Sequence, residues 1–151
     1  MTQEEIEEKI DQHKLWLSDQ SKGQRAIFIK EDLRWANLGY VNLTKADFFG
    51  SDLRKADFSD ADLGGANFTN ANLSGANLSG AYLNGVDLNG VDLTTIRDYE
   101  ITRVWIGWKL LLVKELVIRQ KMIETNDKNL AILYKNSWMA NACKKILKGN
   151  T

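Results

Sequence analysis

Few side chains in this sequence could act as a nucleophile or a general base, because its 151 residues include one histidine and one cysteine. His13 lies on the apolar stripe of an expected N-terminal helix, so we expect a packed residue rather than a base. Lysines near Cys143 could lower the pKa of its thiol, but the favoured interpretation is a buried structural thiol. No phosphate-binding loop, dinucleotide fingerprint, zinc-ligand spacing or nucleophile elbow occurs in the sequence. We therefore expect no enzyme, no cofactor, no metal site and no small-molecule substrate.

A regular series of aspartates is the other candidate for chemistry, because such a series suggests acid–base pairs or calcium sites. These aspartates all occupy one place of a five-residue repeat, and Asn often stands there instead. This exchange favours a role in turns and solvation over a role in catalysis. The series consists of Asp32, Asp47, Asp52, Asp57, Asp62, Asp87 and Asp92.

The repeat that positions these aspartates runs unbroken over residues 26–95, which is fourteen pentads. Nine pentads begin with Ala, twelve have Asp or Asn second, and all have Leu or Phe third. Five residues advance about 500° along an α-helix, which leaves no apolar stripe. In a straight strand, an odd period sends alternate side chains to opposite faces. A chain that bends once per pentad instead keeps every third-place side chain inside. The expected interior stack is Phe28, Leu33, Leu38, Leu43, Phe48, Leu53, Phe58, Leu63, Phe68, Leu73, Leu78, Leu83, Leu88 and Leu93.

The spacing of the phenylalanines indicates how many pentads make one coil. Phe28, Phe48 and Phe68 recur every 20 residues, as stacked layers would if four pentads closed one square turn. Phe58 would then lie on another face. Fourteen pentads make about 3.5 coils, and layers about 4.8 Å apart would give a height of ~17 Å.

The tandem motif A(D/N)LxG resembles the pentapeptide-repeat family over residues 26–95. The resemblance implies a mainly β fold, a right-handed quadrilateral β-helix in which the third-place Leu or Phe and the first-place Ala fill the interior. Such solenoids need both ends covered. Glu31 stands where a small inward residue is expected, and its charge would be costly unless Arg25 pairs with it or the first coil frays.

The flanking segments are expected to be helical caps. In residues 1–25, Thr2 to Glu5 form a capping box. Apolar positions at helical spacing follow, and the pattern from Ile10 to Ala26 resembles the lead-in of many family members. In residues 96–151, segments 99–124 and 129–148 are expected to form a pair of α-helices. The first of these is apolar almost all round and needs burial on more than one side.

The resulting hypothesis is a non-enzymatic scaffold that binds a protein partner, of unknown identity, or a second copy of itself through the C-terminal helices. Three of the five tryptophans lie in residues 96–151, which is consistent with an aromatic interface. An alternative is that these side chains only seal the core. The candidate interaction residues are Trp105, Trp108, Leu112 and Trp138.

The charge distribution leaves two further alternatives open. Residues 96–151 hold 11 basic and 5 acidic residues, so this segment is net +6 and the rest of the chain is net −6. The basic segment could attach to an anionic membrane surface or to nucleic acid, although a solvated cationic face is the usual explanation of such charges. Residues 56–95 contain five Asp and no Lys or Arg, and the family resemblance implies a DNA-mimic inhibitor of a type II topoisomerase. In that case the negative charges of Asp57, Asp62 and Asp87 would contribute to the imitation of DNA.

The expected location is cytoplasmic. The acidic N-terminus has no apolar run typical of a secretory signal, and a single cysteine forms no internal disulfide. The most apolar stretch, residues 104–118, contains three charged residues and is too short to span a bilayer.

Overall fold

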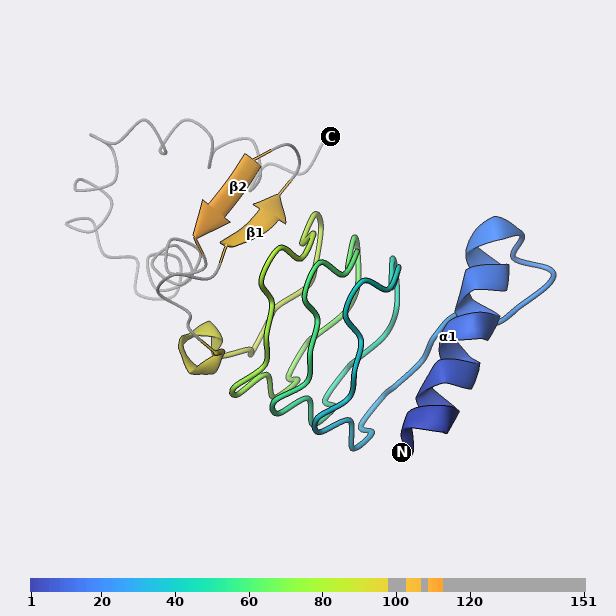
Figure 1. Cartoon of the computed structure of the whole chain (residues 1–151), viewed down its shortest axis with the longest axis horizontal. Helices are drawn as coiled ribbons and strands as arrows, with labels where there is room; N and C mark the ends of the chain where they lie inside the picture. Colours follow the sequence, from blue (N-terminus) through green and yellow to red (C-terminus); the bar gives the residue numbers. More distant parts are fainter. Residues whose placement is uncertain (98–102, 107–108, 113–151) are drawn as a thin grey trace. The chain divides into compact units, whose positions relative to one another are not determined.

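The computed structural model describes residues 1–97, 103–106 and 109–112 (Figure 1). The chain divides into two compact units, Met1–Glu115 and Leu116–Thr151, and every described residue belongs to the first. The elements in chain order are helix α1 (Gln3–Ser18), the 3-10 helix η1 (Leu93–Thr95) and strands β1 (Arg103–Ile106) and β2 (Lys109–Leu112). Between α1 and η1 the repeat winds through stacked coils (Figure 1).

Helix α1 begins where its sequence predicts. The Thr2 hydroxyl accepts a hydrogen bond from the Glu5 amide at 3.2 Å, and the Glu5 carboxylate accepts one from the Thr2 amide at 2.8 Å. The predicted capping box is therefore present. One side of the helix is buried, with Ile6, Ile10 and His13 as its buried residues.

Neighbouring coils are joined by isolated parallel bridges between second-place residues 20 positions apart. Ile27 pairs with Asp47, and Asp47 in turn with Asn67. The Phe28 amide donates to the Asp47 carbonyl at 2.7 Å, and the Asp47 amide donates to the Ala26 carbonyl at 3.0 Å. Each straight segment ends at a corner before it can form a longer strand, so the pairing stays local. This register confirms four pentads per coil. It sorts the second places into four columns, which follow Ile27, Asp32, Asn37 and Asn42.

Each corner is a four-residue turn in which the backbone adopts a left-handed conformation at the fifth place of the pentad. The φ angle is positive, between 53° and 74°, at every fifth place from residue 30 to residue 90. The turn is closed by the next first-place amide, as where Ala36 donates to the Leu33 carbonyl at 3.1 Å. A positive φ at the third residue of the turn is the type II pattern, which favours Gly.

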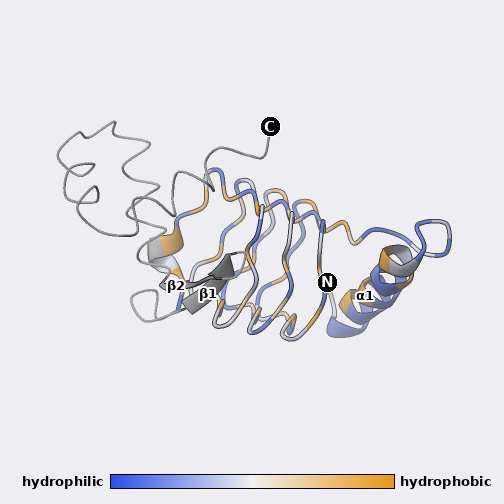
Figure 2. Ribbon diagram, turned by 90° about the horizontal axis from the view of Figure 1, so that it is seen from above, coloured by the Kyte–Doolittle hydropathy of each residue, from blue (hydrophilic) through white to orange (hydrophobic). Residues whose placement is uncertain are grey.

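The interior consists of the third-place and first-place side chains. All third-place side chains are buried except Leu88, which is half-buried. The rings of Phe28, Phe48 and Phe68 stack with centroids 5.0 and 4.7 Å apart, and Phe58 meets Phe48 edge-on at 89°. The predicted stack of three rings, with Phe58 on another face, is confirmed. Figure 2 shows the resulting alternation of hydrophobic and hydrophilic residues along the coils.

The first coil keeps its register at Glu31. The Asp52 amide donates to the Glu31 carbonyl at 3.0 Å, and the Glu31 side chain is half-buried at the open end of the interior. The suggested pairing with Arg25 is absent, because the Arg25 guanidinium lies 3.6 Å from Asp47 instead. Partial exposure, rather than fraying or pairing, makes the charge at Glu31 tolerable.

The prediction of an α-helix over residues 99–124 is wrong for those residues of this range that the structure describes. Arg103–Ile106 and Lys109–Leu112 form an antiparallel two-stranded sheet, in which Trp105 pairs with Leu110. Val104, Trp105 and Ile106 are β-branched or aromatic and favour a strand. Only two residues, one of them glycine, separate β1 from β2 in the sequence, a spacing typical of a hairpin. The expected helix over residues 129–148 lies outside the described residues.

Candidate functional site

The second-place aspartates hold the turns of the β-helix. Asp57 Oδ1 accepts a hydrogen bond from the Ser59 amide at 2.9 Å, and Asp62 Oδ1 accepts one from the Gly64 amide at 3.0 Å. Each is the local turn bond that Asp and Asn side chains typically form. Within the described residues, no group of three or more His, Cys, Asp or Glu side chains could hold a metal ion.

Amide side chains also separate some of these carboxylates along a column. Asn77 Nδ2 donates to Asp57 Oδ1 at 2.9 Å, between neighbouring coils. Burial alone would raise the pKa of Asp57, but hydrogen bonds from Ser59 and Asn77 bring it below its ordinary value. The bridges place Asp57, Asp62 and Asp87 in three different columns. The acidic half of the repeat therefore presents these carboxylates separately rather than as one stripe.

The single histidine is a structural link between α1 and the first coil. His13 has no solvent exposure, and its Nδ1 accepts a hydrogen bond from the Ala26 amide at 3.1 Å. Its ring stacks on Trp16 with centroids 5.5 Å apart. Burial lowers the pKa of His13, the Thr44 carbonyl opposes this fall, and the charge of Arg25 lowers the pKa further. The buried neutral imidazole has no access to a substrate.

Other side chains of α1 satisfy backbone groups at the edge of the first coil. Lys9 Nζ donates to the Ile27 carbonyl at 3.1 Å. The Gln3 amide group donates to the Asn37 carbonyl and accepts from the Asn37 amide, both at 3.3 Å. Groups on two columns that would otherwise lack a partner coil are thereby hydrogen-bonded.

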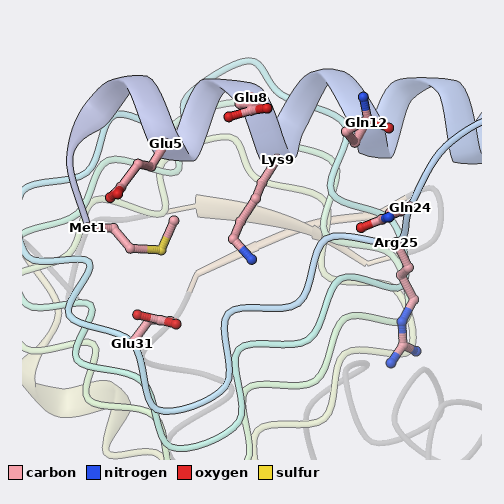
Figure 3. A pocket seen from close by; sticks show the side chains of 8 residues that line it. All are labelled: Met1, Glu5, Glu8, Lys9, Gln12, Gln24, Arg25 and Glu31. Atoms are coloured by element: carbon pink, nitrogen blue, oxygen red, sulfur yellow. The ribbon is translucent and has the colours of Figure 1, made fainter.

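A cleft of about 580 Å³ lies between α1 and the first coil. Figure 3 shows Lys9 extending from α1 toward the coil, with Glu31 on the facing coil and Arg25 beside the chain that enters it. Three acidic and two basic side chains line this cleft, and the two basic ones, Lys9 and Arg25, are already hydrogen-bonded or paired. The cleft is a solvated gap beneath the helix. Its lining residues are Met1, Glu5, Glu8, Lys9, Gln12, Gln24, Arg25 and Glu31.

The corners of the first coil carry large side chains at left-handed positions. Trp35 has φ 65° and is 69% exposed, and Tyr40 has φ 60° and is 80% exposed. A non-glycine residue in this conformation costs about 1 kcal/mol, and neither side chain recovers that cost by burial. Lys30 and Lys45 occupy the other two corners of this coil.

Two arginines lie beside the Trp35 corner, one on each of the first two coils. Arg34 forms two hydrogen bonds to Asp32, at 2.8 and 2.7 Å, and Arg54 binds Asp52 in the same way, its shortest bond 2.6 Å. On the next corner of the same column, Lys55 Nζ lies 4.2 Å from the centre of the Trp35 ring. We call Arg34, Trp35, Tyr40, Arg54 and Lys55 the corner surface.

The interaction residues expected from the sequence differ from the corner surface. Trp105 lies in β1 and Leu112 in β2, whereas Trp108 and Trp138 lie outside the described residues. Trp35 and Tyr40 were not among the expected residues. The signal that identifies them is their place in the pentad: a bulky residue at the fifth position occupies a corner where glycine would be unstrained.

A coil of four short segments closed by type II corners defines a solenoid repeat protein. The profile of the pentapeptide-repeat family matches eight copies, over residues 26–65 and 56–94. Residues 26–94 therefore carry the repeats of the pentapeptide-repeat family, whose members fold as right-handed β-helices.

Three solved structures of pentapeptide repeat proteins are similar to this chain. One comes from the thylakoid lumen of Arabidopsis thaliana (28% identity, 51% of this chain and 63% of that chain, TM-score 0.37). Another is Rfr23 from the cyanobacterium Cyanothece 51142 (34% identity, 47% and 52%, TM-score 0.29). The third is HetL from Nostoc sp. strain PCC 7120, a protein involved in heterocyst differentiation regulation (27% identity, 58% and 50%, TM-score 0.37). This chain thus covers less than two thirds of each.

No curated protein sequence matches this chain significantly. In the part of the chain that the structure describes, no helix has the length and apolar character needed to cross a membrane.

Proposed function

We propose that this protein is a non-enzymatic binding module whose β-helix presents the corner surface to a protein partner. The observation that carries the proposal is the left-handed backbone at two exposed aromatic residues, Trp35 and Tyr40. A side chain retained at such a position, without burial to offset the strain, is best explained by a contact outside the chain.

The composition of the corner surface supports this interpretation. Trp, Tyr and Arg are the residue types that most often dominate the binding energy of protein interfaces. The backbone beneath them is held by bridges on both sides of the second coil, such as Asp32 with Asp52 and Asp52 with Asn72. A rigid support lowers the entropy lost when a partner binds.

In this proposal α1 acts as a cap that keeps the edge of the first coil closed. The hydrogen bonds from Lys9 to the Ile27 carbonyl and between Gln3 and Asn37 occupy groups that could otherwise pair with a strand of another chain. The partner is then recruited by the side chains of the corners rather than by strand addition.

A comparison of variants tests the proposal. The wild-type protein, Trp35→Asn, Tyr40→Asn and the control Tyr82→Asn would each be used for affinity purification from the source organism, with quantitative mass spectrometry. Asn is suited to the corner because Asn70 occupies the same place with φ 58°. Tyr82 is also exposed, at 45%, but occupies a second place, where Asp or Asn stands in twelve of the fourteen pentads.

We expect a protein retained by the wild type and by Tyr82→Asn to be depleted at least ~10-fold by either corner variant, the loss typical of one interface hot spot. Unchanged melting temperatures would show that the corner variants remain folded. A partner set that is the same for all four proteins would refute the proposal.

A further inference from the structure

We infer that the corner surface binds a short acidic peptide segment of the partner, an inference that rests on the binding function proposed above. The first support is the placement of positive charge. Residues 26–95 contain five basic residues, and all five lie in the first two coils. Four of them lie on or beside a single column, the one in which Asp32 pairs with Asp52: Lys30, Arg34, Arg54 and Lys55.

The two arginines of this column are held in fixed orientations. Each uses its Nε and one terminal nitrogen to bind its own aspartate, and Arg34 Nε also lies 3.8 Å from Asp52. A guanidinium carries five N–H donors, so donors remain on each group for an external carboxylate. The side chains of Arg34 and Arg54 are 50% and 48% exposed, which leaves these donors accessible.

The pairs stay ionised at neutral pH. Hydrogen bonds from Arg34 hold the pKa of Asp32 well below its usual range, and those from Arg54 lower the pKa of Asp52. Exposed ion pairs of this kind add little to stability. Their effect here is to orient the guanidinium groups before a ligand arrives.

Trp35 and Lys55 extend the same site across the corner. The ammonium of Lys55 lies over the Trp35 ring, and Trp35 remains 69% exposed. Lys55 itself has no carboxylate within ion-pair distance among the described residues. Its charge and that of Lys30 remain after the two arginine–aspartate pairs cancel, and Glu31, next to Asp32 in the sequence, lowers the net charge of this group of side chains to +1.

The extent of this positive charge favours a peptide over a nucleic acid. It spans two coils, whose strands are about 5 Å apart, and residues 56–95 carry five Asp without Lys or Arg. An extended polyanion that followed the solenoid would be repelled beyond the second coil. A short acidic segment would contact only the basic side chains beside the Asp32–Asp52 pair.

A selection from a random library of 12-residue displayed peptides tests this inference on the full chain. The peptides retained by the wild type and rejected by Trp35→Asn would be sequenced and compared with the input library. Selected peptides would then be measured by fluorescence anisotropy against Lys55→Gln and against Lys45→Gln. The latter is a matched control, because Lys45 has the same corner backbone, φ 64°, on a different column. A fluorescent 12-nucleotide single strand serves as the nucleic-acid probe.

We expect the selected peptides to be enriched in Asp and Glu at least twofold. Their affinity should fall ~3- to 10-fold with Lys55→Gln, as for a charge at the rim of an interface, and remain unchanged with Lys45→Gln. Neutral or basic peptides, equal effects of the two lysine variants, or tighter binding of the oligonucleotide would overturn the inference. The binding function would still stand in these cases if Trp35→Asn depleted a protein partner.

Discussion

The first and last coils of this β-helix have the same corners but different residues in them. The φ angle is 56–65° at Lys30, Trp35, Tyr40 and Lys45, and 69–74° at the glycines of residues 75–90. Because the backbone conformation is nearly the same, its demands cannot explain the difference in residue type. The late corners hold the residue that this backbone favours, whereas the early corners accept strain in order to expose large side chains. We infer that the early coils are adapted to contact a partner and the late coils to stability.

The largest expected effect is on the free energy of unfolding, and it concerns the hydrophobic interior that the early and late coils share. Phe48→Ala should reduce the free energy of unfolding by about 3–5 kcal/mol, because Phe48 stacks between Phe28 and Phe68 in the common interior. Tyr40→Ala, at an exposed corner, should change it by less than ~0.5 kcal/mol. Urea denaturation of both variants measures the contrast. A similar loss in the two would mean that the early corners contribute to the core.

Alanine at two late corners separates backbone strain from crowding. Gly85→Ala should cost about 1 kcal/mol from the left-handed conformation alone, because the nearest atom to the new Cβ, the Gly65 Cα, would be 3.9 Å away. At Gly80 the new Cβ would overlap the Asp60 carboxylate. Gly80→Ala should therefore cost more, ~2 kcal/mol if Asp60 moves aside. Thermal denaturation would detect both losses. Late corners that tolerated alanine freely would remove the basis of the comparison.

Acidification should weaken the first coil before the last. The pKa of His13 is lowered in the folded state, so its contribution to stability is complete above pH ~6.5, the unfolded value. It is lost as the pH falls from there toward the folded pKa, at no more than about 1.4 kcal/mol per pH unit for one proton. Hydrogen exchange should accelerate at the Ala26 amide, which donates to His13, relative to the Asn77 amide in a later coil.

His13→Asn is the control for this pH dependence, because its amide oxygen can accept a hydrogen bond but does not titrate. The difference in exchange between Ala26 and Asn77 should then no longer depend on pH between 7.5 and 5. If it still did, a different group would be responsible.

The smallest expected effect comes from placing glycine, the residue of a late corner, at an early corner of the same column. Tyr40 and Gly80 lie at equivalent corners, two coils apart. Tyr40→Gly should stabilise the protein by ~0.5 kcal/mol, because relief of the left-handed strain slightly exceeds the added flexibility of the unfolded chain. Differential scanning calorimetry can resolve such a change. A clear loss of stability would show that Tyr40 supports the fold.

Much of the solenoid could be predicted because its information is local and periodic. The recurrence of Phe28, Phe48 and Phe68 was enough to predict the four-pentad coil, and Thr2 with Glu5 was enough to predict the start of α1. Prediction failed after the repeat, where no period constrains the chain. Residues around Trp105 have both helical spacing and strand propensity, and short apolar segments of this kind do not distinguish the two.

The corner surface could not be predicted in the same way. Trp35 and Lys55 are 20 residues apart, and no sequence pattern predicts that the Lys55 ammonium lies over the Trp35 ring. Only the fifth-place position of Trp35 and Tyr40 was visible beforehand, and its meaning depends on the sign of φ. The links from Gln3 to Asn37 and from His13 to Ala26 likewise join segments with no common pattern.

By itself, the amino-acid sequence determined the pentad period, the inward side chains, the coil register and the beginning of α1, because each follows from residue types at fixed short spacings. Only the tertiary structure decided which backbone groups α1 satisfies, which column collects the positive charge and which aromatic side chains remain exposed. These properties depend on contacts between segments that are distant in the sequence. The periodic pattern of buried residues does not specify those contacts.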